Sequence, residues 1–161
     1  MKFADLGLSD ETLRAITESG YDEPTPIQAG VIPSVLMMRD IIGIAQTGTG
    51  KTASFVLPMI DILAHGRARA RMPRSLILSP TRELAAQVAE SVRTYGRNLP
   101  SLRTAVIFGG VNINPQIDML RRGVDIIVAT PGRLLDHVGQ RTVDLSSVEV
   151  LVLDKADRRI D

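Results

Sequence analysis

Five short apolar runs constrain the fold of this chain more than any other feature. Each run is rich in isoleucine and valine, and its apolar residues are continuous instead of alternating with polar ones. Such runs are typical of strands that are buried on both faces, as in a parallel sheet covered by helices. The runs occupy residues 40–45, 75–79, 104–108, 125–129 and 148–153. We therefore expect a mostly parallel sheet.

Helical signals precede and separate these runs. Ser9 is a good N-cap, Asp10 and Glu11 suit a first turn, and Gly20 follows the predicted end of this first helix. Further helical patterns cover residues 51–64, 83–95, 115–121 and 131–138. Alternating strands and helices predict a doubly wound α/β domain, with helices on both faces of the sheet and ligands at the carboxyl ends of the strands.

Length and composition narrow the class of protein further. A chain of 161 residues fits one domain with one layered core. The chain has no cysteine, its first residues lack a signal-peptide profile, and no apolar run is long enough to span a bilayer. We therefore expect a cytoplasmic protein without a membrane partner. The formal net charge of +1 means that any nucleic-acid surface has to be local.

The junction between the first predicted strand and its helix has the pattern of a phosphate-binding loop. It consists of Ala45, Gln46, Thr47, Gly48, Thr49, Gly50, Lys51 and Thr52, with alanine at the position of the usual first glycine. The two glycines let backbone N–H groups face an anion, and the following helix adds the positive end of its dipole. Lys51 would reach the β- and γ-phosphates, and the Thr52 hydroxyl would ligate Mg²⁺. The loop therefore predicts a nucleotide site.

Four further polar segments follow predicted strands. They are residues 80–82, 109–110, 130–133 and 154–157. Because the carboxyl ends of parallel strands lie at one edge of a sheet, we expect all four at the same edge as the phosphate loop. A shared edge favours a common functional site over a set of unrelated turns.

Taken in order, six motifs of this chain resemble those of DEAD-box RNA helicases. They are Pro-Thr-Pro-Ile-Gln at 24–28, the phosphate loop, Pro-Thr-Arg-Glu-Leu-Ala at 80–85, Gly-Gly at 109–110, Thr-Pro-Gly-Arg at 130–133 and Val-Leu-Asp-Lys-Ala-Asp at 152–157. The resemblance extends from Phe3 to the last residue. It implies that residues 1–161 form part of a RecA-like phosphate-loop domain, with the Q-motif region at 3–28, and that ATP, Mg²⁺ and RNA are its ligands.

The resemblance assigns adenine recognition to the Q motif. If the resemblance holds, Tyr21 stacks on the adenine base, Gln28 hydrogen-bonds to the edge of the base, and Phe3 is the upstream aromatic residue. A planar ring and a carboxamide suit those tasks. A purely structural interpretation is also open, because Thr25, Pro26 and Gln28 have the spacing of a helix capping box.

The resemblance also implies an RNA surface that contacts the sugar-phosphate backbone and does not read sequence. Arginine offers forked donors to phosphate, glycine allows close backbone approach, and a helix start presents free N–H groups. The structural alternatives are an ordinary helix start at Thr130 and an ion pair of Arg82 with a neighbouring acid. The implied RNA-binding residues are Pro80, Thr81, Arg82, Gly109, Gly110, Thr130, Pro131, Gly132 and Arg133.

The acidic motif departs from the family at one position. Lys155 stands where the family has glutamate, the residue that orients and deprotonates the attacking water. Asp154 is expected to hold Mg²⁺ together with Thr52. The resemblance also places Lys51 and Asp157 among the catalytic residues. Because a lysine is protonated near neutral pH and adds positive charge beside the metal, we expect ATP hydrolysis close to background.

The sequence ends at Asp161, before the region where the family carries a Ser-Ala-Thr motif and a second RecA-like domain. That domain supplies arginine fingers and half of the RNA groove, so it is the expected partner in a parent protein, and this chain alone should be inactive or nearly so. The strand that carries the Ser-Ala-Thr motif would also lie in the middle of the sheet. Its absence predicts an isolated chain that is marginally stable or prone to aggregate.

Two other functions are compatible with part of this pattern. A non-catalytic regulator, which binds ATP or RNA and competes with an intact relative, would account for Lys155. An unrelated phosphate-loop enzyme, such as a small-molecule kinase, would keep residues 45–52 but leaves the segments at 80–85 and 130–133 unexplained. Nucleotide binding separates these functions. A site that prefers adenine and loses this preference in Gln28→Ala would support a helicase, whereas a site indifferent to the base would favour the unrelated enzyme.

Overall fold

The structure, a computed structural model, describes residues 1–37, 49–64, 72–99 and 101–154. These residues form two compact units, which we describe separately. The helical unit contains Met1–Gly66 and Ser91–Pro100, and the sheet unit contains Arg67–Glu90 and Ser101–Asp161. The first predicted strand, at residues 40–45, lies outside the described residues.

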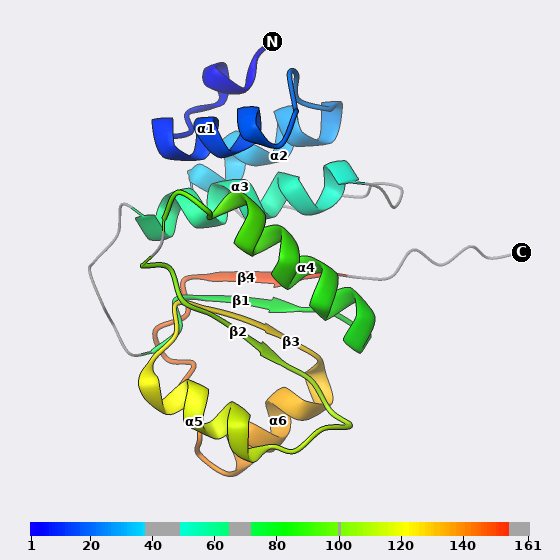
Figure 1. The fold of residues 1–161 in the computed structure, drawn as a ribbon, viewed down its shortest axis with the longest axis vertical. Helices are drawn as coiled ribbons and strands as arrows, with labels where there is room; N and C mark the ends of the chain where they lie inside the picture. The colour runs from blue at the N-terminus through cyan, green and yellow to red at the C-terminus, as the bar shows by residue number, and fades with distance from the viewer. Residues whose placement is uncertain (38–48, 65–71, 100, 155–161) are drawn as a thin grey trace, which may run out of the picture. The chain divides into compact units, whose positions relative to one another are not determined.

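Four helices and the end of a fifth make up the described part of the helical unit (Figure 1). They are the short 3-10 helix η1 (Phe3–Leu6), α1 (Asp10–Glu18), α2 (Pro26–Leu36), α3 (Thr49–Ala64) and the last turn of α4 (Arg82–Tyr95). Helix α3 packs against α1 and α2, and most of its residues are buried. Val56 and Ile60 of α3 and Ile32 of α2 are inaccessible to solvent, so α3 is the central helix of this unit.

The start of α1 is held by a carboxylate from α3. Asp61, which is 7% exposed, accepts hydrogen bonds from Ser9 N (3.0 Å), from Ser9 Oγ and from Thr12 Oγ1 (2.9 Å). The Ser9 hydroxyl therefore binds Asp61 and makes no capping bond to its own helix. Negative charge at a helix N-terminus is favourable, so this contact stabilises both the start of α1 and its packing on α3.

The sheet unit is built on four parallel strands in the order β2-β3-β1-β4. The strands are β1 (Ser75–Leu78), β2 (Thr104–Ile107), β3 (Ile126–Ala129) and β4 (Val150–Leu153). Figure 1 shows α5 (Asn114–Arg122) and α6 (Pro131–Gly139) on one side of the sheet and the first turns of α4 on the other. For the strands that the structure describes, the predicted parallel α/β fold with helices on both faces is confirmed.

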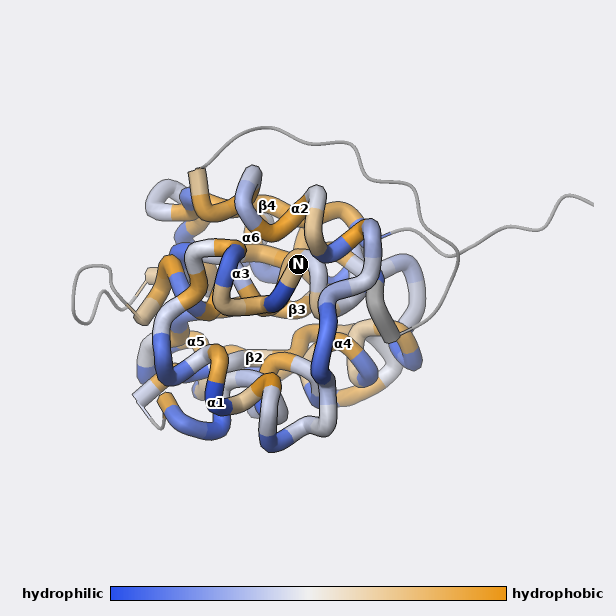
Figure 2. Tube along the Cα trace, turned by 90° about the horizontal axis from the view of Figure 1, so that it is seen from above, coloured by the Kyte–Doolittle hydropathy of each residue, from blue (hydrophilic) through white to orange (hydrophobic). Residues whose placement is uncertain are grey.

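The core of the sheet unit lies between the sheet and the helices α5 and α6. Leu76, Ile127 and Ala105 face this core from three neighbouring strands, and Ile127 is the register partner of the other two. Leu120 of α5 and Leu134 of α6 close it from the helices. Strands β1 and β3 are buried over nearly their whole length, and Figure 2 colours the tube at β3 as hydrophobic. This burial explains why their sequences are continuously apolar.

Strand β4 is one of the two edge strands among the described strands, since it pairs with β1 alone, as β2 pairs with β3 alone. Leu151 and Leu153 are 57% and 61% exposed, and they point to the same face of the sheet. An edge strand that exposes large apolar side chains is a typical site of self-association.

Within the described residues, the predicted and observed elements agree within one or two residues, apart from two helices near the N-terminus. The sequence indicated only the start of α2 and did not indicate η1. Helix α2 has apolar residues around most of its circumference and contains Gly30 and Pro33, so it lacks the periodicity of a surface helix. No helix within the described ranges is long and apolar enough to cross a bilayer.

Candidate functional site

The strand order brings three of the predicted segments together at the carboxyl edge of the sheet. Strands β2, β3 and β1 are direct neighbours, and residues 109–110, 130–133 and 80–82 follow their ends. We call residues 80–82, 109–110 and 130–132 the rim loops. Their exposed members are Pro80, Thr81, Arg82, Gly110, Pro131 and Gly132, while Gly109 and Thr130 are half-buried.

Arg82 is held in place by the ring of Phe108, which follows β2 and directly precedes the rim loop at 109–110. It is the first residue of α4, and the Thr81 hydroxyl accepts the Leu84 N–H (3.2 Å) at this helix start. The Arg82 guanidinium lies 4.8 Å above the centre of the Phe108 ring, a cation–π contact. A Cβ atom added to Gly110, whose φ is +81°, would lie 3.2 Å from Arg82 Nη1. Glycine at position 110 therefore suits both the local backbone and the space beside Arg82.

The middle rim loop is the start of α6. Thr130 is its N-cap, its side chain makes no capping hydrogen bond, and its N–H donates to Ile107 O (2.9 Å). Pro131 has no N–H to satisfy, and the N–H groups of the next two residues have no acceptor within the helix. Unpaired N–H groups at a helix start, together with the positive end of the dipole, form a local anion-binding feature.

Arg133, predicted to contact RNA, turns its guanidinium toward the protein. Its side chain is 12% exposed. Nη1 donates to Gln116 Oε1 (3.2 Å), Nη2 donates to Val111 O (3.0 Å), and Nε lies 3.4 Å from Asp136 Oδ2. Arg133 therefore ties α6 to α5 and to the loop after β2.

Gln116 and His137 form a buried polar network that the sequence analysis missed. Gln116 is 6% exposed and His137 is fully buried. Gln116 Nε2 donates to Phe108 O (3.0 Å), and Gln116 Oε1 lies 3.0 Å from His137 Nε2. Burial lowers the pKa of His137, and the positive charge of Arg133 adds to this effect. No local pattern marks these residues, because their partners come from other elements.

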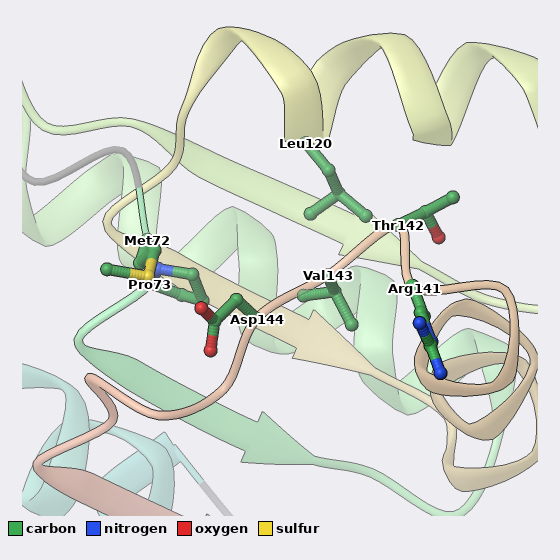
Figure 3. Close-up of a pocket in the computed structure, with 7 residues that line it drawn as sticks. All are labelled: Met72, Pro73, Leu120, Arg141, Thr142, Val143 and Asp144. Atoms are coloured by element: carbon green, nitrogen blue, oxygen red, sulfur yellow. The ribbon is translucent and has the colours of Figure 1, made fainter.

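The network reaches a cavity of about 210 Å³ near the amino ends of β1 and β4 (Figure 3). His137 Nδ1 lies 2.7 Å from Thr142 Oγ1, and Thr142 is one of the lining residues. The cavity is lined by Met72, Pro73, Leu120, Arg141, Thr142, Val143 and Asp144. None of these seven residues was predicted as a site residue.

Gln28, the predicted adenine-binding amide, forms the capping box that was the structural alternative. Thr25 N donates to Gln28 Oε1 (2.9 Å), and Gln28 N donates to Thr25 Oγ1 (3.3 Å). The Gln28 side chain is 2% exposed. The amide carbonyl is therefore already engaged in starting α2.

The predicted aromatic residues are also engaged within the helical unit. The Tyr95 hydroxyl donates to the Tyr21 hydroxyl (3.3 Å), and the two rings lie 6.3 Å apart at an angle of 40°. Burial raises the pKa of Tyr95, and its hydrogen bond with Tyr21 adds to this effect. Tyr21 itself is half-buried, whereas Phe3 is 5% exposed and belongs to the core. Tyr21 thus has the more accessible ring.

The described end of the phosphate loop forms the first turn of α3. Thr49 and Gly50 begin this helix, and Lys51 and Thr52 are half-buried. An ammonium group and a hydroxyl in the first turn of a 16-residue helix fit a bound phosphate with its Mg²⁺. The predicted residues Ala45, Gln46, Thr47 and Gly48 lie outside the described residues.

The acidic motif is described only at its first residue. Asp154 follows β4, is half-buried, and donates its N–H to Leu78 O (2.8 Å). It therefore lies at the carboxyl edge of the sheet, beside the end of β1. Lys155 and Asp157 lie outside the described residues. Within the described ranges, no group of three or more acidic, histidine or cysteine side chains could hold a metal ion.

The parallel sheet and its rim loops define a RecA-like α/β domain, and comparison with known proteins assigns the family. A family model described as DEAD/DEAH box helicase matches residues 25–161. The chain belongs to the DEAD/DEAH box helicase family.

Several curated relatives match almost the whole of this chain. ATP-dependent RNA helicase DeaD of Mycobacterium tuberculosis (strain H37Rv) is 47% identical over 158 residues, which are 98% of this chain and 28% of the relative. DeaD of Escherichia coli (strain K12) is 46% identical over 98% of this chain and 25% of its own length. ATP-dependent RNA helicase CshA of Limosilactobacillus reuteri is 47% identical over 100% of this chain and 32% of its own length. The chain thus spans about a quarter to a third of these relatives.

Proposed function

We propose that this chain binds ATP with Mg²⁺ and binds the sugar-phosphate backbone of RNA, as part of an ATP-dependent RNA helicase. The observation that carries the proposal is the side-by-side position of three predicted RNA-binding segments at one edge of the sheet. The names of the relatives, ATP-dependent RNA helicases DeaD and CshA, support the same function.

The rim loops supply chemistry suited to a phosphate backbone. Arg82 is exposed, its guanidinium rests on the Phe108 ring, and an arginine offers forked N–H donors that suit a phosphate group. Gly110 and the first turn of α6 offer backbone N–H groups at exposed positions. Such contacts position a strand without reading its bases, so we expect weak dependence on RNA sequence.

The proposed nucleotide site combines the first turn of α3 with the Q motif. The family motifs assign phosphate binding to Lys51, Mg²⁺ binding to Thr52 and Asp154, and adenine stacking to the ring of Tyr21. Bound Mg²⁺ would neutralise phosphate charge. The proposal keeps Gln28 as the adenine-recognising amide, but its carbonyl already accepts the Thr25 N–H. Gln28 therefore has to serve the helix start and the base at the same time.

ATP hydrolysis by this chain is proposed to be close to background. Lys155 replaces the glutamate of the family motif, and loss of a general base typically costs about 10²- to 10⁴-fold in rate. We expect phosphate release from this polypeptide, measured with purified protein, Mg-ATP and RNA, to stay close to background, and we expect Lys155→Glu to raise it in a protein that also carries a second RecA-like domain. Brisk turnover that Lys155→Glu leaves unchanged would contradict the proposal.

The second candidate function is a non-catalytic regulator that binds ATP and RNA. Lys155 is the observation that favours it. A regulator retains nucleotide and RNA binding but gains no turnover when Lys155→Glu is introduced. An unrelated phosphate-loop enzyme is not retained as a candidate, because the family match covers residues 25–161.

Fluorescence anisotropy with a labelled single-stranded oligouridylate, in Mg-ATP, tests the RNA surface. We expect Arg82→Ala to weaken binding by roughly tenfold, because a charge-assisted contact is lost. Arg121→Ala is the matched control, since Arg121 is exposed at the far end of α5 from the rim loops. Equal affinities of both variants and the parent chain would contradict the proposed surface.

A further inference from the structure

The amide of Gln116 has one possible orientation. Phe108 O can only accept a hydrogen bond, so the atom 3.0 Å from it must be the amide nitrogen. Arg133 can only donate, so the atom 3.2 Å from its Nη1 must be the amide oxygen. Both partners agree, and the orientation of this buried side chain follows from its surroundings.

This orientation also assigns the proton on His137. Because Gln116 Oε1 accepts at 3.0 Å, His137 Nε2 must carry a hydrogen and donate it. In the neutral ring Nδ1 is then an acceptor. The single hydrogen of the Thr142 hydroxyl is within reach of both Nδ1 (2.7 Å) and His137 O (3.2 Å), so this hydroxyl can donate to the ring. The buried Gln116 amide thus hydrogen-bonds to the Phe108 carbonyl at the end of β2, to the Arg133 guanidinium and to the His137 ring.

The three partners of Gln116 come from the elements that carry two of the rim loops. Phe108 directly precedes Gly109 and Gly110, whereas Arg133 and His137 belong to α6, whose start is the middle rim loop. Arg133 adds a second link, because its Nη2 donates to Val111 O (3.0 Å). The loop after β2 and the start of α6 are therefore joined through side chains that solvent hardly reaches.

We propose that Gln116 and Arg133 are positioning residues that set the spacing between Gly110 and the start of α6, so that both loops meet one RNA backbone. Arg133 then acts through the loop that it holds and not as a phosphate ligand, since its guanidinium is committed to Gln116, Val111 and Asp136. The inference rests on the proposed RNA function of the rim loops.

The affinity and the salt dependence of RNA binding test this role. We expect Gln116→Met, which keeps the side-chain length but removes the amide, to weaken oligouridylate binding by roughly tenfold. The slope of log K against log salt should stay unchanged, because no phosphate-neutralising charge is lost. Gln140→Met, at an exposed glutamine that follows α6, is the matched control and should bind like the parent chain.

Arg133→Lys provides a second variant in case Gln116→Met fails to fold. Lysine keeps the positive charge but cannot reach Gln116 Oε1 and Val111 O with one planar group. A positioning role predicts that Arg133→Lys weakens RNA binding about as much as Arg133→Ala. Near-parental affinity of Arg133→Lys, together with a clear loss in Arg133→Ala, would identify a direct charge contact and overturn the inference.

The outcomes separate this inference from the proposed function. If Arg82→Ala weakens RNA binding while Gln116→Met and Arg133→Lys bind normally, the RNA surface stands and the positioning role is wrong. If Arg82→Ala and Gln116→Met both bind normally, the proposed function fails as well.

Nitrogen NMR of the His137 ring gives a readout that does not depend on RNA. The geometry predicts a neutral ring with its hydrogen on Nε2 in the parent chain, and loss of this signature in Gln116→Met. A ring with its hydrogen on Nδ1 in the parent chain would overturn the network on which the inference rests.

Discussion

Two buried glutamines, one in each unit, show how differently the two proposed ligand regions are organised. Gln28 in the helical unit is 2% exposed, and Gln116 in the sheet unit is 6% exposed. The capping bonds of Gln28 go to Thr25, three residues away. The partners of Gln116 lie 8, 17 and 21 residues away and come from other elements. Among the described contacts, the Gln28 amide starts a helix, whereas the Gln116 amide joins several parts of a fold.

The difference teaches that burial and polarity alone do not indicate the role of a side chain. A capping box is local, so its loss should disturb one helix end. A shared tertiary anchor leaves several buried groups without partners when it is removed. The predictions below test this contrast in order of expected effect.

The largest effect is expected from comparing Gln116→Met with Gln28→Met. The first change leaves Phe108 O, Arg133 and His137 without their buried partner, so it should lower the free energy of unfolding by about 3 kcal/mol. The second removes one side of a capping box and should cost about 1 kcal/mol. Urea unfolding of both variants measures the difference. Equal losses would break the comparison.

The second prediction concerns the pH dependence of stability. Burial and the charge of Arg133 lower the pKa of His137, although Asp136 opposes the shift. The histidine of the unfolded chain has a pKa of about 6.5, so as the pH falls it takes up a proton before His137 of the folded chain does. We expect the contribution of His137 to the free energy of unfolding to be fully present above a pH of about 6.5 and to decrease below it. Urea unfolding at pH values above and below about 6.5 should show this decrease in the parent chain and a smaller decrease in His137→Gln.

The third prediction tests the local character of the Gln28 region. Thr25→Ala removes the side chain that accepts the Gln28 N–H, and it should cost about 1 kcal/mol of unfolding free energy. Thr25→Ser keeps the hydroxyl and is the control. A loss above about 2 kcal/mol for Thr25→Ala would mean that this box supports more than one helix end.

The smallest effect on stability is expected at the edge strand. Leu151→Lys replaces a side chain that is 57% exposed, so the free energy of unfolding should change by less than about 0.5 kcal/mol. Self-association, measured by light scattering, should nevertheless decrease, because a charge is placed on an exposed strand edge. Leu135→Lys, at a 68% exposed position of α6, is the control and should affect association less.

The sequence predicted the strands and most helices because each depends on local patterns. Continuous apolar runs marked β1 to β4, and the Thr25 to Gln28 spacing marked the start of α2. The strand order β2-β3-β1-β4 could not be read from that alternation, because it depends on which strands pair across the sheet.

The same limit explains the inward position of Arg133. Its motif implies a contact with RNA, which stays a prediction, and the buried partner Gln116 lies 17 residues away on another helix. Only the packing of α5 against α6 brings the two side chains together. Residues such as Gln116 and His137 therefore carry no local signal of their role.

The salt dependence of oligouridylate binding to the parent chain, Arg82→Ala and Arg121→Ala tests the central claim most directly. If the rim loops bind the RNA backbone, Arg82→Ala should reduce the slope of log K against log salt by about 0.7, the value for one single-strand phosphate contact. Arg121→Ala should leave the slope unchanged. An unchanged slope in Arg82→Ala together with a reduced slope in Arg121→Ala would place the RNA contact elsewhere and contradict the account.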